Sequence, residues 1–80
     1  MPDPKHSVPG FGPRLKDLRT RREMSREDLA AKVGLHQTQI QKLESGVNAP
    51  YLDTAMALAD ALGVGLELLD PRKKLPKKLG

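Results

Sequence analysis

The stretch LAAKVGLHQTQIQKLESG, residues 29–46, decides the fold of this 80-residue chain. Apolar residues recur at helical spacing on both sides of Gly34, and glycine often ends a helix because it accepts a left-handed backbone. Gly46 ends the second helical stretch in the same way. Two short helices joined by Gly34-Leu35-His36 form a helix-turn-helix arrangement. The side chains expected to fill the angle between these helices are Leu29, Val33, Leu35 and Ile40.

The helix before the turn has a clear start signal. Ser25 is a good N-cap, and Asp28 resembles the acidic member of a capping box. This helix is expected to end at Val33. The helix after the turn is expected over residues 37–45, with its N-terminal turns projecting from the domain. A projecting helix of this kind fits the major groove of B-DNA.

Helical spacing also predicts elements on either side of this pair. A first helix is expected over residues 14–23, where Leu15 and Leu18 share a face, and another over residues 52–62. Residues 64–69 fit either a short fifth helix or a strand, and we favour the helix. Since the chain has one Tyr, one Phe and no Trp, its core must be aliphatic, which favours an all-α fold.

The two ends of the chain differ from its middle. Residues 1–13 are rich in Pro and Gly and predict a disordered, flexible arm. Residues 70–80 form a basic tail, which either adds phosphate contacts or serves only solubility. The folded domain is therefore expected over residues 14–69.

The formal net charge of +4 is unevenly distributed. Residues 14–26 carry six basic and two acidic side chains, whereas residues 43–69 carry four acidic side chains and no basic one. The first half of the domain could therefore face a polyanion, and the second half could not. A solvated helix face is the alternative explanation of such a charge run.

The residues that are missing exclude several classes of protein. Without cysteine, the chain has no disulfide and no thiolate that could hold zinc or attack a substrate. No apolar run reaches the roughly 18–20 residues that a membrane span needs. Neither His6 nor His36 has a plausible carboxylate or nucleophile partner. We therefore expect that the protein is not an enzyme and that it has no metal site and no cofactor.

Several anchors occur in a fixed order and spacing. They are Leu29-Ala30-Ala31-Lys32-Val33-Gly34-Leu35, Ile40, Leu43-Glu44-Ser45-Gly46, Pro50 and Ala59-Asp60-Ala61-Leu62-Gly63-Val64. In these residues the chain resembles the helix-turn-helix domain of the Cro/repressor (XRE) family, over residues 14–69. The resemblance implies a compact five-helix, lambda-repressor-like domain that binds DNA and is commonly a homodimer. One departure is His36, which stands where a Ser or Thr N-cap is usual.

The resemblance assigns roles to individual residues. Family domains read bases with the positions that match Gln37, Thr38, Gln41 and Lys42. These side chains suit base edges, since Gln can bond adenine, Lys can bond guanine and the Thr methyl can touch thymine. Phosphate contacts are expected from Arg26, Gln39, Ser45, Asn48 and Tyr51; packing against the next helix is the alternative for Tyr51. Arg19 and Glu44 match a buried ion pair that joins the first helix to the third.

A dimer surface is expected after the fourth helix, because so small a domain cannot bury every apolar side chain there. Its residues are Val64, Leu66, Leu68 and Leu69.

These residues together predict a sequence-specific, double-stranded DNA-binding regulator. We expect it to be a repressor that binds a near-palindromic operator as a homodimer, in the cytoplasm and associated with the nucleoid. The alternative is an antitoxin-type protein that neutralises a partner toxin while regulating its own operon. A strand at residues 64–68 that pairs across a dimer would favour that alternative. A third and weaker hypothesis is an architectural protein with little sequence preference.

Overall fold

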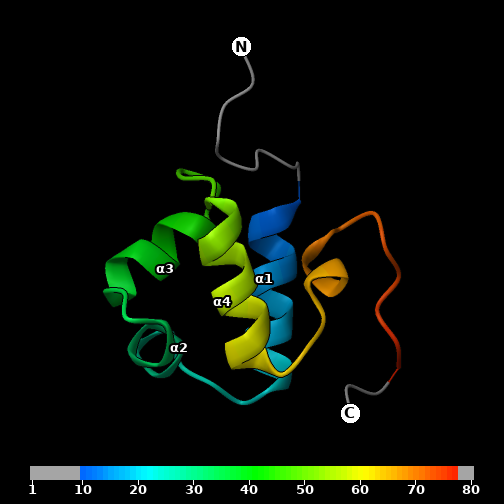
Figure 1. The fold of residues 1–80 in the computed structure, drawn as a ribbon, viewed down its shortest axis with the longest axis horizontal. Coiled ribbons are helices and arrows are strands. Elements are labelled where there is room, and N and C mark those ends of the chain that lie inside the picture. Colours follow the sequence, from blue (N-terminus) through cyan, green and yellow to red (C-terminus); the bar gives the residue numbers. More distant parts are fainter. Residues whose placement is uncertain (1–9, 78–80) are drawn as a thin grey trace.

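Four α-helices and one short 3₁₀ helix make up the computed structural model, which describes residues 10–77 (Figure 1). The elements are α1 (Phe11–Arg21), α2 (Arg26–Val33), α3 (Gln37–Glu44), α4 (Leu52–Leu62) and η1 (Leu66–Leu69). Helix α3 packs against α1 and α2, and α4 packs against α2 and η1. The all-α prediction is confirmed, with four α-helices rather than five in this part of the chain.

Helix α1 begins at Phe11, three residues earlier than expected. The expectation that the arm reaches residue 13 was therefore wrong for residues 11–13. Gly10 takes the left-handed N-cap position, and Pro13 fits the first turn because the helix needs no N–H there. Phe11 is 8% exposed, so burial of its ring supports this extra turn. The rest of the predicted arm, residues 1–9, lies outside the described residues.

The core is aliphatic, as the composition requires, with Phe11 as its one aromatic member among the described residues. Each α-helix contributes to it, and η1 contributes Leu69. Its fully buried large side chains are Leu15, Leu18, Leu29, Ile40, Leu58 and Leu62. The helix-turn-helix pair therefore has a continuous support behind it, formed by α1 and α4.

Residues 66–69 form a 3₁₀ helix, so the strand alternative for this segment is not observed. A 3₁₀ helix has about three residues per turn, which places Leu66 and Leu69 on one side. Leu69 is 2% exposed and belongs to the core, whereas Leu66 lies at the rim. Leu69, which was predicted on a dimer surface, is thus buried within the domain itself.

The segment after η1 is tied to α1 by Arg14. Its guanidinium donates hydrogen bonds to the carbonyl oxygens of Leu68, Asp70, Pro71 and Lys73. The carboxylate of Asp70 pairs with Arg72, and hydrogen bonds from the Arg72 side chain and N–H lower the pKa of Asp70 to about 2. Residues 70–77 thus run along the far side of α1 from α3 (Figure 1). The last part of the expected basic tail, residues 78–80, lies outside the described residues.

Gly12 allows α1 to approach the end of α3 closely. A Cβ atom at this position would collide with the backbone carbonyl groups of Leu43 and Glu44. These are rigid backbone atoms, so no side-chain movement can relieve the collision. The spacing of α1 and α3 therefore depends on the absence of a side chain at residue 12.

We predict that Gly12→Ala lowers the free energy of unfolding by about 1–3 kcal/mol, the usual cost of overpacking a core. This cost should exceed the gain in helix propensity of about 1 kcal/mol. Gly65→Ala is the matched control, because its Cβ would meet only the flexible carboxylate of Glu67. Urea denaturation of both variants measures the difference, and equal stability would show that α1 and α3 have room to separate.

Candidate nucleic-acid interface

Helix α3 has one buried face and one exposed face. Ile40 and Leu43 are buried, and they hold the helix against α1 and α2. The four residues predicted to read bases are all exposed and lie at helical spacing; they are Gln37, Thr38, Gln41 and Lys42. The structure therefore brings the predicted base-reading residues together on one outward surface.

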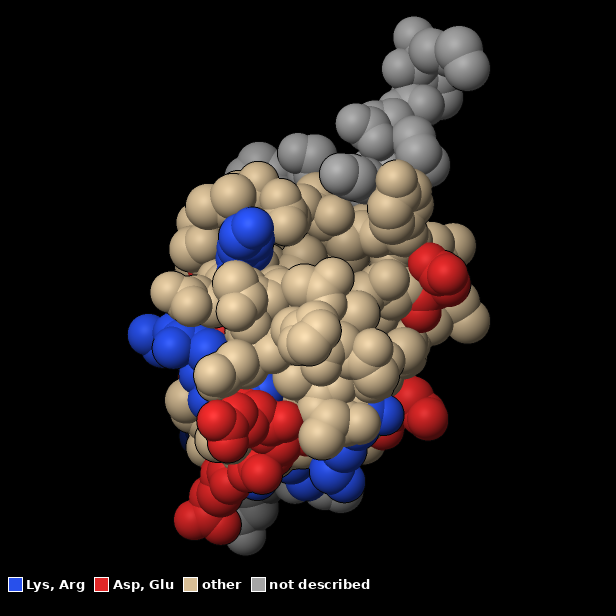
Figure 2. Space-filling view, turned by 90° about the vertical axis from the view of Figure 1, so that its left-hand side faces the viewer, with Lys and Arg blue, Asp and Glu red and all other residues tan. Residues whose placement is uncertain are grey.

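The side of the molecule on which α2 and α3 lie carries less positive charge than the basic composition of residues 14–26 indicated. Figure 2 shows it as mainly uncharged at the centre, with basic side chains to the left and at the bottom, and acidic ones at the lower left and on the right. The exposed charged residues of α2 and α3 are Glu27, Asp28, Lys32 and Lys42. Recognition here would thus depend more on hydrogen bonding by Gln and Thr than on a dense positive field.

Three arginines, two in α1 and one directly after it, turn inward, which explains this modest charge. Arg14 binds carbonyl groups in η1 and after it, and the Arg22 Nε donates to the carbonyl oxygen of Leu62 at 2.8 Å. Arg19 reaches Glu44. Fewer charges of the basic first half are therefore left to face a polyanion. The sequence contained a signal for the inward position of Arg22, because helical spacing places it on the same face as Leu15 and Leu18.

Arg19 and Glu44 form the ion pair that the family resemblance implied. The Arg19 Nε lies 2.6 Å from Glu44 Oε2, and its Nη2 lies 3.2 Å from Oε1. The two side chains are 9% and 3% exposed. Arg19 Nη1 also donates to the carbonyl oxygen of Met24 at 2.7 Å. One guanidinium thus joins α1, the chain before α2 and the end of α3.

Arg26 also binds Glu44. Its Nε lies 3.2 Å from Glu44 Oε1, and its side chain is 41% exposed. Sequence reasoning placed Arg26 at the phosphate backbone and missed this second contact, because only the folded chain brings residues 26 and 44 together. The N-terminus of α2 is capped by the predicted capping box between Ser25 and Asp28. The hydrogen bond that the Ser25 backbone N–H donates to the Asp28 carboxylate is the main cause that lowers the pKa of this carboxyl.

The start of α3 is capped by Gln39 rather than by a Ser or Thr. The His36 N–H donates to Gln39 Oε1 at 2.9 Å, which is one half of a capping box. Gln39 was predicted to contact phosphate. Its side-chain amide oxygen, Oε1, already accepts the hydrogen bond from the His36 N–H. The sequence held a signal for this contact, since Gln three residues after the cap position is the usual partner in that motif.

The other predicted phosphate contacts lie beyond the end of α3. Ser45 and Asn48 are exposed, and the Asn48 N–H donates to the carbonyl oxygen of Lys42 at 3.2 Å. Tyr51 takes the N-cap position of α4 and is about half exposed. These residues border the C-terminal end of the candidate reading helix.

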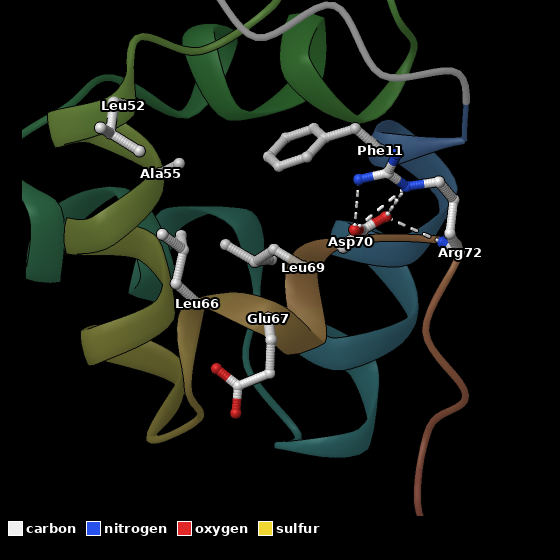
Figure 3. A pocket seen from close by; sticks show the side chains of 8 residues that line it. All are labelled: Phe11, Leu52, Ala55, Leu66, Glu67, Leu69, Asp70 and Arg72. Carbon is white, nitrogen blue, oxygen red and sulfur yellow. Dashed lines mark hydrogen bonds and ion pairs between the residues drawn. The ribbon is translucent and has the colours of Figure 1, made fainter.

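An apolar surface lies elsewhere, between α4, η1 and the start of α1 (Figure 3). It includes a pocket of about 430 Å³ lined by Phe11, Leu52, Ala55, Leu66, Glu67, Leu69, Asp70 and Arg72. Leu52, Met56 and Leu66 are exposed to between 39% and 55%. Leu52 lies at the rim of the pocket. Val64 and Leu68, predicted on the dimer surface, are half-buried.

The His, Asp and Glu side chains of residues 10–77 form no group of three or more that could hold a metal ion. None of the helices formed by these residues is long and apolar enough to span a membrane.

The fold and this site define a helix-turn-helix, DNA-binding transcriptional regulator. A family model of helix-turn-helix domains, HTH_3, matches residues 15–69. The chain therefore belongs to this XRE-type family, and the predicted resemblance is confirmed. No curated protein sequence matches the chain.

Solved structures agree with this family. The restriction-modification controller protein C.AhdI from Aeromonas hydrophila is 36% identical, with a TM-score of 0.72, over 74% of this chain and 89% of its own. The biofilm regulator SinR, solved in complex with DNA, shares the fold at 23% identity and a TM-score of 0.70, over 74% of this chain and 95% of its own.

The same fold also occurs inside a larger protein. HppE, solved in one structure with iron and substrate, is 28% identical, with a TM-score of 0.74; the match covers 82% of this chain and only 38% of HppE. A fold can serve proteins of different function, so the residues on the surface of α3 must carry the functional argument.

We predict that His36→Ser raises the free energy of unfolding by about 0.5–1 kcal/mol, because serine is a better N-cap residue than histidine. Gln39→Ala is the matched control and should lower it by a similar amount, since it removes the acceptor for the His36 N–H. Thermal denaturation of the two variants gives the comparison. A less stable His36→Ser variant would show that the imidazole supports α3 in a way that serine cannot.

Proposed function

We propose that this protein binds a specific DNA sequence as a homodimer, with α3 in the major groove, and acts as a repressor. The observation that carries the proposal is the exposed row of Gln37, Thr38, Gln41 and Lys42 above a fully buried Ile40. A rigidly supported helix can hold such side chains at fixed positions opposite base edges. Their donors, acceptors and methyl group offer contacts to adenine, guanine and thymine.

The residues around α3 are suited to the phosphate backbone. The proposed contacts are Arg26, Gln39, Ser45, Asn48 and Tyr51. Gln39 would use its amide Nε2, because its Oε1 accepts the His36 N–H. Similarity to SinR, which was solved on DNA, supports duplex DNA as the ligand. Phosphate contacts position the protein, and base contacts then specify the sequence.

The proposed homodimer would use the apolar surface between α4 and η1. Its exposed residues are Leu52, Met56 and Leu66. A two-fold dimer presents two copies of α3, which would contact half-sites about 10 base pairs apart. The operator is therefore expected to be a near-palindrome. A dimer covering such a site would exclude other proteins from the same grooves, which is the basis for proposing repression.

We predict that selection from a random duplex library at about 150 mM salt enriches an inverted repeat. Gln37→Ala and Lys42→Ala should each lose preference at particular bases, at a cost of about 1–3 kcal/mol per lost bidentate contact. Lys73→Ala is the control, because residue 73 is exposed on the far side of α1 from α3 and should leave the preference unchanged.

Other outcomes would replace this proposal. Binding without enrichment, fading as salt rises, would indicate an architectural protein with little sequence preference. An enriched sequence without a repeat would argue against the dimer. No DNA binding at all would direct the search to a protein partner, as in the antitoxin hypothesis.

A further inference from the structure

Three charged side chains meet between α1, α2 and α3. Glu44 contributes one negative charge, and Arg19 and Arg26 contribute one positive charge each. The Glu44 carboxylate is 3% exposed, and both of its oxygens accept from Arg19. Arg19 alone therefore balances the buried carboxylate. Arg26 brings a second cation to the same oxygen, Oε1.

The surplus positive charge of this cluster lies at Arg26. Arg19 is buried, whereas the side chain of Arg26 is 41% exposed at the first residue of α2. At this end of the helix the carboxylate of Asp28 already accepts the Ser25 N–H within the capping box. An anion that reaches Arg26 would therefore complete the charge balance of the cluster, at a helix end whose dipole also favours it.

The geometry of arginine allows it to hold two acceptors at once. Its guanidinium has five N–H donors in a planar fork, and Arg26 uses Nε for Glu44. Within residues 10–77 the side chain of Arg26 has no further hydrogen bond, so its Nη donors remain for another acceptor. A lysine could contact Glu44 or a phosphate, but it lacks this rigid fork.

We propose that Arg26 is a positioning residue that couples a bound DNA phosphate to α3. One guanidinium donates through Nη to the phosphate and through Nε to Glu44, the last residue of the reading helix. Phosphate binding at α2 thereby fixes the orientation of α3, and base reading depends on it. This inference rests on the proposed function, since it requires that α3 faces DNA.

The first test needs no operator. A mixed-sequence duplex of 20 base pairs is titrated into ¹⁵N-labelled protein, and the Arg26 Nε–H and the Glu44 amide are followed by NMR. The coupling predicts that both signals shift together in the unmodified protein. In the Arg26→Lys variant the NMR signal of the Glu44 amide should no longer shift when the duplex is added. A Glu44 amide that stays still in the unmodified protein while the duplex binds would overturn the inference, even if the protein is sequence-specific.

The second test compares affinity for a specific and a mixed-sequence duplex. The specific duplex is the one enriched by selection, and the variants are Arg26→Lys and, as a matched control on the same helix, Lys32→Ala. Lys32 is exposed and does not contact Glu44.

Arg26→Lys keeps the charge, so its affinity for the mixed-sequence duplex should change less than about twofold and its salt dependence should stay the same. Its affinity for the specific duplex should fall about tenfold, as expected when one charge-assisted hydrogen bond is lost. Lys32→Ala should lower the affinity for both duplexes equally. An unchanged ratio of the two affinities in Arg26→Lys would show that residue 26 acts as a simple phosphate contact, which contradicts the coupling.

Discussion

The buried carboxylate of Glu44 sets the position of α3 and, with it, the rest of the binding surface. A charge that is removed from water must be paired, and breaking such a pair by removing one partner costs about 3–5 kcal/mol. Arg19 satisfies both oxygens of Glu44 and also binds the Met24 carbonyl oxygen. Gly12 supports the same arrangement, because it lets α1 pass close to the backbone at the end of α3.

This use of arginine changes how the charge of the chain should be interpreted. Arg14, Arg19 and Arg22 stabilise the ends of η1, α3 and α4 through carbonyl and carboxylate oxygens. They contribute to the net charge, but they are largely directed into the domain. The exposed Lys73, Lys74 and Lys77 belong to a segment that runs on the far side of α1 from α3 (Figure 1). The outward face of α3 therefore combines moderate charge with hydrogen-bonding side chains, which suits recognition of sequence.

Much of the fold could be predicted from local signals, and the failures have physical causes. Ser25, Gly34 and Gly63 mark helix ends through their own backbone preferences, so the predicted bounds of α2 and α4 match the structure within a residue. The start of α1 was missed because Gly12 and Pro13 suggest a break, whereas burial of Phe11 and close packing of Gly12 extend the helix. The exposure of Leu52 and the burial of Leu69 could not be predicted, since helical spacing alone does not show which apolar residues the neighbouring elements cover.

The candidate site, too, could be predicted only in part from the sequence. The outward row on α3 follows from its periodicity, and the Arg19 and Glu44 positions follow from the family resemblance. The Arg26 contact with Glu44 joins elements that only tertiary packing brings together, so no local pattern contains it. The role of Gln39 as the partner of His36 was visible as a motif, but it competes with the phosphate role of the same side chain.

In the proposed mode of binding, α3 is held from behind by Glu44 and is the surface that meets DNA. Backbone amide shifts, mapped as duplex DNA is added to ¹⁵N-labelled protein, test this directly. We expect the largest shifts over residues 36–42 and at the start of α2, with residues 72–77 unaffected. Shifts confined to residues 72–77, with α3 unchanged, would contradict it.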